Sequence, residues 1–259
     1  MRIGVIGGTG VDELPELTRG RVVQVATRFG SAVLVETQFA GAELVFVPRH
    51  GPDHSVPPSL VNYRAQTAAL KKTGVRRVIG VCAVGSLTSD LPPGSFAVLV
   101  DFIDLTKRRV STFFDEPGQP VAHTDFTQPY CPELSKALVE ACGARAVQFE
   151  PRAIYAGVEG PRYETPAEVK LYASWGAHVV GMTNVPEVVL AREAGLCYGA
   201  LAVVSNFASG LSPRPLSHQE VREVIQGVQE DIVSILRTTI ERIPPVQGCE
   251  CGTNTALLL

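Results

Sequence analysis

Three segments between Tyr155 and Asn206 combine residue types that suit the binding of a flat, polar heterocycle. They are residues 157–165 (Gly-Val-Glu-Gly-Pro-Arg-Tyr-Glu-Thr), residues 181–191, and the apolar run 199–204, which ends at Ser205-Asn206. An apolar strand that ends in Asn can aim one amide, both donor and acceptor, into a cleft. Tyr163 and Glu164 can stack on a ring and accept a ring N–H. A base with both a carbonyl and an N–H, such as a 6-oxopurine, needs this set of groups.

A second set of polar residues follows the expected strands. Gly7-Gly8-Thr9-Gly10 comes after the first strand, Arg49-His50 after the fourth and Ala83-Val84-Gly85-Ser86 after the fifth, while Thr183 and Asn206 end later strands. Ligands bind at the carboxyl ends of strands in open parallel sheets. Glycine N–H groups, hydroxyls and an Arg fork together predict a cradle sized for free phosphate. A dinucleotide site is disfavoured because the third glycine of that motif is missing and Pro15 interrupts the following helix.

The elements that must position these groups alternate between strands and helices. Strands are predicted over residues 2–6, 22–26, 32–36, 43–47, 77–83, 96–103, 152–158, 179–182 and 197–205. Helices are predicted over residues 59–73, 132–142, 166–175, 186–194 and 217–242, with Ser59 as an N-cap and with Ser217 and Glu220 as a capping box. This alternation, with Val/Ile-rich strands, predicts one α/β domain over residues 1–243, with a mixed, mostly parallel central sheet flanked by helices. Residues 244–259 are expected to form a tail, and the polar segment 110–132 is the best candidate for a loop that crosses to another subunit.

The composition is that of an ordinary globular protein. The chain has 259 residues, of which 45% are hydrophobic and 19% charged, and its net charge is -3. Nucleic-acid binding through a basic surface is therefore not expected. No apolar run is long enough to span a bilayer or to serve as a signal peptide, so no membrane partner is expected and the cytoplasm is the predicted compartment.

The six cysteines fall into two groups. Four are scattered and are expected to be reduced core residues: Cys82, Cys131, Cys142 and Cys197. Cys249 and Cys251 form a Cys-Glu-Cys near the end of the chain. We expect a loose pair of thiols there, with a redox-active or tail-stapling disulfide as the alternative. A zinc site is not expected, because no second Cys/His pair follows at finger spacing.

Over about residues 2–243 the chain resembles the trimeric purine nucleoside phosphorylase / methylthioadenosine phosphorylase family. The matching stretches are residues 3–10, 48–63, 157–165 and 181–195. The resemblance implies a nucleoside phosphorylase fold, a homotrimer and phosphorolysis of a purine N-glycosidic bond. Inorganic phosphate is then the co-substrate, and neither a metal nor an organic cofactor is expected.

The resemblance also implies individual roles. The phosphate-binding set is Thr9, Arg49, His50, the amide of Ala83 and Thr183, and the substrate-binding set is Tyr163, Glu164, Met182, Asn206, His218 and His123. Within these sets Met182 lies under the ribose and Tyr163 packs on the base. Asn206 and His50 are the candidate catalytic residues, because Asn206 can donate to N7 of the leaving purine and His50 stands beside the phosphate.

The choice of substrate depends on two places in the sequence. The methylthioadenosine branch has a pattern like Thr-Asp-aromatic-Asp after its late strand. This chain instead has Ser205-Asn206-Phe207-Ala208, and both this stretch and Glu164 resemble the 6-oxopurine branch. His218 aligns with a histidine that binds a 5′-hydroxyl, while His123, expected from the neighbouring subunit, resembles the methylthio branch. Cys82 departs from the family, which carries Thr or Asn there.

Phosphorolysis of inosine and guanosine, to free base and ribose 1-phosphate, is therefore the favoured function. S-methyl-5′-thioinosine or S-methyl-5′-thioadenosine phosphorylase is the alternative. A non-catalytic nucleoside-binding module is the alternative of another class. A calcium-dependent nucleoside hydrolase is disfavoured because the sequence lacks an Asp-rich site.

Overall fold

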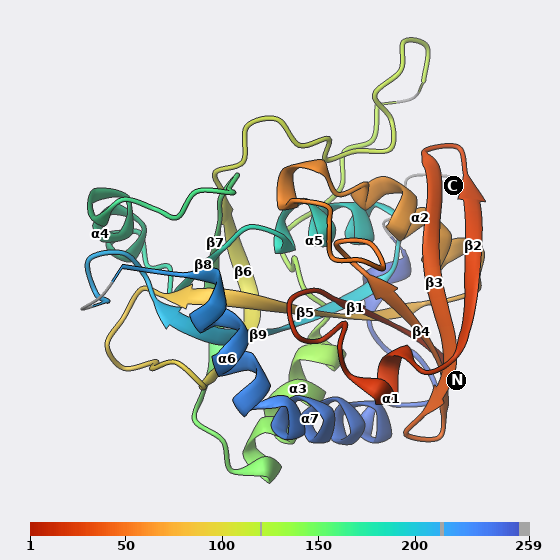
Figure 1. Ribbon diagram of the computed structural model, residues 1–259. Coiled ribbons are helices and arrows are strands. Elements are labelled where there is room, and N and C mark those ends of the chain that lie inside the picture. The colour runs from red at the N-terminus through yellow and green to blue at the C-terminus, as the bar shows by residue number, and fades with distance from the viewer. Residues whose placement is uncertain (120, 213–214, 254–259) are drawn as a thin grey trace.

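A twisted sheet runs through the centre of the protein, and the computed structural model describes residues 1–119, 121–212 and 215–253 (Figure 1). The strands are β1 (Arg2–Gly7), β2 (Arg21–Thr27), β3 (Gly30–Phe39), β4 (Ala42–Pro48), β5 (Arg77–Ser86), β6 (Phe96–Asp104), β7 (Phe149–Gly157), β8 (Val179–Gly181) and β9 (Cys197–Phe207). The helices are α1 (Pro15–Thr18), α2 (Tyr63–Lys72), α3 (Pro132–Arg145), α4 (Pro166–Ser174), α5 (Asn184–Glu193), α6 (His218–Gly227) and α7 (Gln229–Arg242), with short 3-10 turns at Pro58–Leu60 and Glu250–Gly252.

The sheet is mixed, and part of it closes on itself. Its strand order is β2-β3-β4-β1-β5-β8-β7-β6-β9, and β9 also pairs with β5. The pairs β1–β4, β1–β5, β5–β9, β6–β7 and β7–β8 are parallel. The pairs β2–β3, β3–β4, β5–β8 and β6–β9 are antiparallel. Because β5 is shared, the carboxyl ends of β1, β4, β5 and β9 meet at one edge.

Most helices cover the sheet in two layers, each packed on a separate hydrophobic cluster, while α4 packs on a third, smaller cluster. One cluster joins α2 and α5 to the sheet through small and aliphatic residues such as Ala69, Leu70 and Leu190. The other joins α1, α3, α6 and α7 through residues such as Leu138 and Leu236. Figure 1 shows α3 and α7 side by side on one side of the sheet and α2 and α5 on the other. The predicted single-domain α/β fold is confirmed.

The last helices pack against the turn that follows β1. Gly10 has a φ of +76°, and a Cβ at this position would lie 2.6 Å from Cγ2 of Ile225 in α6. A glycine is therefore required both by the backbone conformation and by the close approach of the helix. Gln229, at the start of α7, donates a hydrogen bond from Nε2 to the Gly10 carbonyl over 3.2 Å. The turn and the α6–α7 region are thus held together.

The predicted strands are all present, but two predicted helices need correction. The helix expected over residues 59–73 begins only at Tyr63, because Pro57 and Pro58 lead into a 3-10 turn and Asn62, not Ser59, accepts the capping hydrogen bond from the Ala65 N–H. The helix expected over residues 217–242 breaks at Val228, whose φ and ψ of -117° and 14° are not helical.

Smaller differences lie at helix starts. Ser217 caps α6 as predicted, but the structure shows only one half of the expected capping box, the bond that Ser217 accepts from the Glu220 N–H. Pro15 does not prevent a helix, because it occupies the first turn of the short helix α1. Val185 in α5 has extended backbone, so regular helix starts at Pro186, as predicted.

The C-terminal segment is bound to the body of the protein as far as the structure describes it. The Gly248 N–H donates to Glu133 over 2.6 Å, and Cys251 is buried. The expectation of a loose thiol pair is therefore wrong, because the segment packs against the start of α3. Residues 254–259 of the expected tail, and Pro120 of the expected crossing segment, lie outside the described residues. The division at residue 243 stays a prediction.

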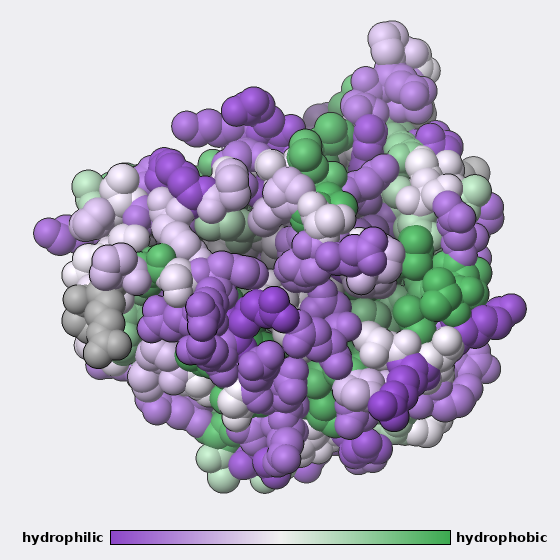
Figure 2. Space-filling model, viewed as in Figure 1, coloured by the Kyte–Doolittle hydropathy of each residue, from purple (hydrophilic) through white to green (hydrophobic). Residues whose placement is uncertain are grey.

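The segment between β6 and α3 stands out from the body, as Figure 1 shows for its yellow-green loop at the top. Figure 2 shows hydrophilic residues over most of this face of the molecule, with hydrophobic residues gathered at the right beside the β2–β3 hairpin. In the described part of the chain, every helix is too short or too polar to cross a bilayer.

Candidate active site

One cavity of about 490 Å³ collects nearly all the residues that the sequence singles out. The predicted residues that line it are Thr9, Arg49, His50, Ala83, Tyr163, Glu164, Met182, Thr183, Asn206 and His218. His123 is exposed on the projecting loop and does not line this cavity. Cys82 does not line it either, because its side chain is buried behind the cavity wall. The departure from the family at Cys82 therefore leaves the cavity surface unchanged.

The cavity lies where strands end, although one strand reaches it from the opposite direction. Thr9, Arg49 and Asn206 stand at or just after the carboxyl ends of parallel strands β1, β4 and β9. The short strand β8 is antiparallel to β5, with Val180 opposite Gly85. Continuing this register places Met182 opposite Ala83 and Thr183 opposite Cys82, in the second half of β5. The expectation that carboxyl ends of parallel strands alone build the site is thus incomplete.

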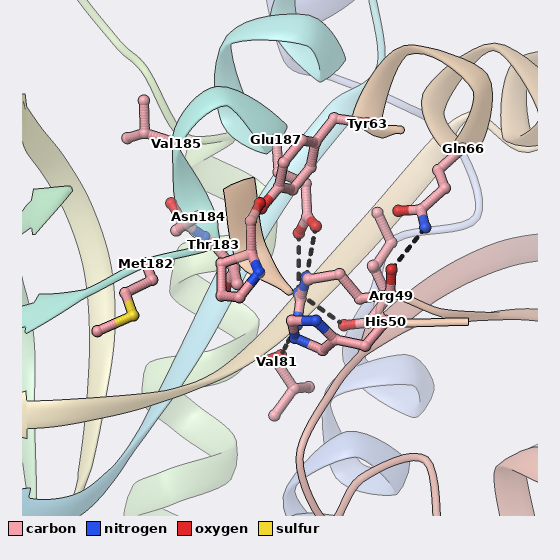
Figure 3. A network of polar contacts seen from close by, with 12 residues as sticks. Arg49, His50, Tyr63, Gln66, Val81, Met182, Thr183, Asn184, Val185 and Glu187 are labelled. Atoms are coloured by element: carbon pink, nitrogen blue, oxygen red, sulfur yellow. Dashed lines mark hydrogen bonds and ion pairs between the residues drawn. The ribbon is translucent and has the colours of Figure 1, made fainter. Parts of the chain in front are cut away.

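Arg49 is tied into a buried network, not held free at the cavity wall (Figure 3). Its Nε and Nη2 donate to the two carboxylate oxygens of Glu187 over 2.7 and 3.0 Å, and both side chains are only 1% exposed. Nη1 donates to the Val81 carbonyl over 2.9 Å, and Nη2 also to that of Ile6 over 3.2 Å. The bidentate fork expected for an anion is therefore used on Glu187. One N–H of Nη1 is left for a ligand.

Glu187 in turn belongs to a chain of buried polar groups. It accepts a hydrogen bond from the Tyr198 hydroxyl over 2.5 Å, and that hydroxyl accepts one from Asn184 over 2.9 Å. Tyr130 donates to the side-chain Oδ1 of Asn184 over 2.5 Å. Glu187, Tyr198, Asn184 and Tyr130 thus each have a hydrogen-bond partner within the network. The position of Arg49 is therefore determined by buried groups behind the cavity.

His50 is held as a neutral imidazole. Its Nδ1 lies 2.8 Å from the Val56 carbonyl, and since a carbonyl only accepts, Nδ1 carries the proton. Burial and the neighbouring Arg49 charge lower the pKa of His50 to about 4. Its Nε2 is then an acceptor. Gly8 must be a glycine here, because a Cβ would lie 2.8 Å from the His50 ring and 3.2 Å from Nη1 of Arg49.

Two hydroxyls complete the predicted cradle. Thr183 precedes α5, and its side chain makes no capping bond to that helix, while its backbone N–H donates to the Tyr155 hydroxyl over 3.1 Å. Thr9 Oγ1 lies 3.4 Å from Nε2 of His54. Both hydroxyl-bearing residues line the same cavity as His50. The cradle therefore offers donors from Thr9, Thr183 and Arg49 and an acceptor from His50.

Asn206 has a determined amide orientation. Its Nδ2 donates to the Phe207 carbonyl over 3.0 Å, which places Oδ1 toward the Ser205 hydroxyl, 2.8 Å away. The Ser205 hydroxyl also lies 3.1 Å from the Val84 carbonyl, so the amide is assigned by the Phe207 carbonyl, which can only accept. One N–H and one carbonyl lone pair of Asn206 are left for a ligand. This is the donor-acceptor pair that the sequence predicts.

Glu164 is buried, which excludes the simpler interpretation of a solvated carboxylate at the start of α4. It is 7% exposed, and burial raises the pKa of its carboxyl group. The next residue, Thr165, caps α4 through a complete capping box with Glu168, which fixes the direction in which the chain enters the helix. Tyr163 is half-buried beside Glu164 in the cavity wall.

His54 is a cavity residue that the sequence reasoning missed. Its Nδ1 lies 2.6 Å from the Asp12 carboxylate, and its ring is tilted against those of His50 and His218, with ring centroids 4.7 and 6.3 Å away. Its φ of 49° is uncommon for a residue with a side chain and is typical of constrained functional loops. The only sequence signal was its place in the matching stretch 48–63.

Arg109 is a second residue without a signal in the sequence. Its guanidinium donates to the carbonyls of Met182, Val185 and Glu159, and its side chain is 2% exposed. It therefore holds the backbone on which Met182 and Thr183 stand.

His218, the first residue of α6, is exposed at the mouth of the cavity, and partial burial lowers its pKa.

The family model described as "Phosphorylase superfamily" matches residues 2–241. The chain belongs to the phosphorylase superfamily. It is 47% identical over 252 residues to a protein from Moorella thermoacetica named "Probable 6-oxopurine nucleoside phosphorylase", covering 97% of both chains. It is 41% identical over 252 residues to a "Probable S-methyl-5'-thioinosine phosphorylase" from Methanopyrus kandleri, covering 96% of both. A structure of methylthioadenosine phosphorylase from Schistosoma mansoni in complex with adenine superposes with a TM-score of 0.91 at 31% identity, covering 98% of this chain and 96% of that one.

These similarities confirm the predicted family and the nucleoside phosphorylase fold. They extend over almost the full length of this phosphorylase-superfamily chain, so the cavity lies within the matched region. The relatives differ in the substrates for which they are named, and the family alone does not decide between those substrates.

Proposed function

We propose that the protein catalyses phosphorolysis of 6-oxopurine nucleosides, inosine and guanosine, to the free base and ribose 1-phosphate. The observation that carries the proposal is the pairing of an oriented Asn206 amide with a buried Glu164 carboxyl in one cavity. The name of the Moorella thermoacetica relative supports the same substrate class. Inorganic phosphate is the co-substrate, and no cofactor is required by this chemistry.

The phosphate is held at the end of the cavity that carries Thr9, His50, Ala83 and Thr183. Thr9 and Thr183 donate through their hydroxyls, the Ala83 amide is proposed to donate as well, and Arg49 gives its one remaining N–H. The His50 Nε2 lone pair accepts the proton of monohydrogen phosphate, which orients the dianion without protonating the imidazole. In a site shielded from water, such preorganised groups stabilise the charges that develop in the transition state.

The reaction breaks the C1′–N9 bond while a phosphate oxygen forms a bond to C1′. The electron pair of the broken bond passes into the purine, and the sugar develops oxocarbenium character beside the dianion. Asn206 donates to N7, where negative charge gathers, and its carbonyl oxygen lies in the same plane for a further contact to the base. Glu164 accepts the N1–H of a 6-oxopurine. Met182 supports the ribose and Tyr163 packs on the base.

A specific observation keeps S-methyl-5′-thioinosine as a second candidate. His218 is exposed at the mouth of the cavity and has Val221 of the same helix beside it as an apolar wall. A 5′-hydroxyl suits His218, and a 5′-methylthio group suits Val221. The Methanopyrus kandleri relative is named for that methylthio substrate. Both candidates use the same 6-oxopurine base contacts.

His123 is proposed to enter the cavity of a neighbouring chain in a trimer. It is exposed in the segment between β6 and α3 and does not line the cavity of its own chain. The exposed Val121 beside it, 78% accessible, offers an apolar contact for a second copy. The active site is then completed only in the assembly.

A substrate panel tests the proposal. Release of base is measured from inosine, guanosine, adenosine, S-methyl-5′-thioadenosine and S-methyl-5′-thioinosine, each with and without phosphate. We expect phosphate-dependent cleavage of inosine and guanosine, and 6-aminopurine nucleosides slower by about 10⁴, because Glu164 faces a bare N1 lone pair in adenine. Comparable turnover of S-methyl-5′-thioadenosine and inosine refutes the base assignment. Tight nucleoside binding with no release of base identifies a binding module instead.

A further inference from the structure

Four cysteines from three distant parts of the chain meet at one point of the fold. They are Cys131 before α3, Cys197 at the start of β9, and Cys249 and Cys251 in the C-terminal segment. Their sulfur atoms all lie within 4.8 Å of one another, and all four are free thiols. We propose that this cluster is a structural binding site for Zn²⁺, coordinated by the four thiolates.

The spacing of the sulfurs supports tetrahedral coordination. With Zn–S bonds of about 2.3 Å, neighbouring sulfurs of a tetrahedral site lie roughly 3.8 Å apart. The Sγ of Cys249 lies 3.6 Å from that of Cys131 and 3.4 Å from that of Cys197. One small shift of each side chain brings all four to this separation. Zn²⁺ with four Cys ligands is a common closed structural site.

Each ligand is positioned by backbone contacts independent of the thiols. The Cys131 N–H donates to the Tyr198 carbonyl over 2.7 Å, and the Cys197 N–H donates to the Arg76 carbonyl over 2.9 Å. The C-terminal segment is held by the bond from Gly248 to Glu133. The cluster is therefore largely preformed, which lowers the cost of ordering it around an ion.

The surroundings suit thiolates. Cys131 is the N-cap residue of α3, a 14-residue helix whose positive end stabilises an anionic sulfur. On binding, each thiol loses one proton and forms one bond to the ion, so four protons are released for each Zn²⁺.

No local motif marks this site in the sequence, because no second Cys/His pair follows Cys249 and Cys251. The partners instead lie 118 and 52 residues before Cys249 in the sequence. The cluster also lies at the amino end of β9, whereas Asn206 is near its carboxyl end. The ion would thus fasten the C-terminal segment to α3 and β9 without contacting the active site.

The test is the zinc content of the full-length protein purified under reducing, oxygen-free conditions. We expect about one zinc ion per chain, and in stripped protein one equivalent of Co²⁺ with the strong sulfur-to-metal absorption of a four-thiolate site. The Cys249→Ser and Cys251→Ser variants should lose most of the metal and melt at a lower temperature. Cys142→Ala is the matched control, because Cys142 is a buried cysteine of α3 outside the cluster.

Two outcomes overturn the proposal. One is reduced wild-type protein that binds neither Zn²⁺ nor Co²⁺ above the level of Cys251→Ser. The other is non-reducing peptide mapping that finds the four cysteines joined in two disulfides, with no metal uptake after reduction.

Discussion

In the proposed function Asn206 sets the base preference, because its neighbours fix the direction of its amide. Ser205 occupies one side of the carbonyl oxygen and the Phe207 carbonyl occupies one N–H. An aspartate at this position keeps the shape but has no N–H to donate. The remaining polar groups of the cavity then suit an exocyclic amino group better than a carbonyl.

We therefore expect Asn206→Asp to lower kcat/KM for inosine by about 10² to 10³, the usual effect of losing one preorganised donor. The ratio of activity on S-methyl-5′-thioadenosine to activity on inosine should rise at the same time. Asn62→Asp is the control, because Asn62 caps α2 through its side-chain oxygen and does not line the cavity. An unchanged ratio in Asn206→Asp contradicts the assigned role.

The lowered pKa of His50 leads us to expect that the stability of the protein depends on pH. Its pKa is about 4 in the folded protein and about 6.5 in the unfolded chain, so the unfolded chain binds more protons between these values. The contribution of His50 to the free energy of unfolding is therefore fully present above pH 6.5. It is lost as the pH is lowered toward 4, by up to about 3 kcal/mol.

Urea unfolding of wild type and His50→Asn at pH 7.5 and pH 5 checks this expectation. Asn keeps a donor for the Val56 carbonyl but does not titrate. The loss of stability on acidification should therefore be smaller in His50→Asn than in wild type. Equal losses in the two proteins show that His50 is not the titrating group.

The Arg49–Glu187 pair fastens the end of β4 to α5. Both charges are buried, and removal of one partner leaves the other uncompensated. We expect Arg49→Met or Glu187→Met alone to lower the free energy of unfolding by about 3–5 kcal/mol, and the double variant to lose less than the sum of the two. Arg145→Met is the control, because its pair with Asp231 is partly exposed and should contribute below about 1 kcal/mol.

Urea unfolding of the four variants measures these values. Additive losses in the double variant contradict the coupling.

The same pair also affects how phosphate kinetics are interpreted. A change at Arg49 alters the cavity wall through Glu187 as well as through the lost N–H. Thr183→Val tests the phosphate assignment more directly, because the Thr183 hydroxyl makes no capping bond.

The elements were predictable from sequence where local chemistry is strong. The strands follow from their Val/Ile-rich runs, and α4 and α6 begin at the Thr165 and Ser217 caps. The late start of α2 and the break at Val228 were not predictable, because proline geometry and tertiary packing override helical periodicity there. The use of the Arg49 fork on Glu187, 138 residues away, has no local signal at all.

The cavity was predictable in composition but not in detail. Polar residues that follow strands indicated Thr9, Arg49, Thr183 and Asn206, and the sheet brings them together. His54 and Arg109 were missed because their contacts, to Asp12 and to the carbonyls around Met182, join segments far apart in the sequence. The cluster of four cysteines was missed for the same reason.

In the whole molecule, the projecting loop predicts an assembly. We expect sedimentation equilibrium to give a mass of three chains, which is three times 27.7 kDa or about 83 kDa. His123→Ala should keep this mass but lose activity, because the change affects a neighbour's cavity. A fully active monomer refutes the proposal.

Hybrid assemblies make the test stricter. Chains with His123→Ala have an intact Asn206, and chains with Asn206→Asp have an intact His123. Mixed refolding of the two should restore part of the wild-type inosine activity, because some cavities then receive both native residues. If His123 acts within its own chain, mixing restores nothing.

The packing of α6 on the turn after β1 has a thermodynamic consequence. The same helix supplies His218 and Val221 to the proposed sugar side of the cavity and rests on Gly10, one residue after Thr9 on the proposed phosphate side. A phosphate that orders the turn after β1 also restricts the motion of α6. The nucleoside then binds to a helix that has already lost part of its conformational freedom, so its binding costs less entropy. Phosphate and nucleoside should therefore bind with positive cooperativity. The factor by which each raises the other's affinity must be the same in both directions.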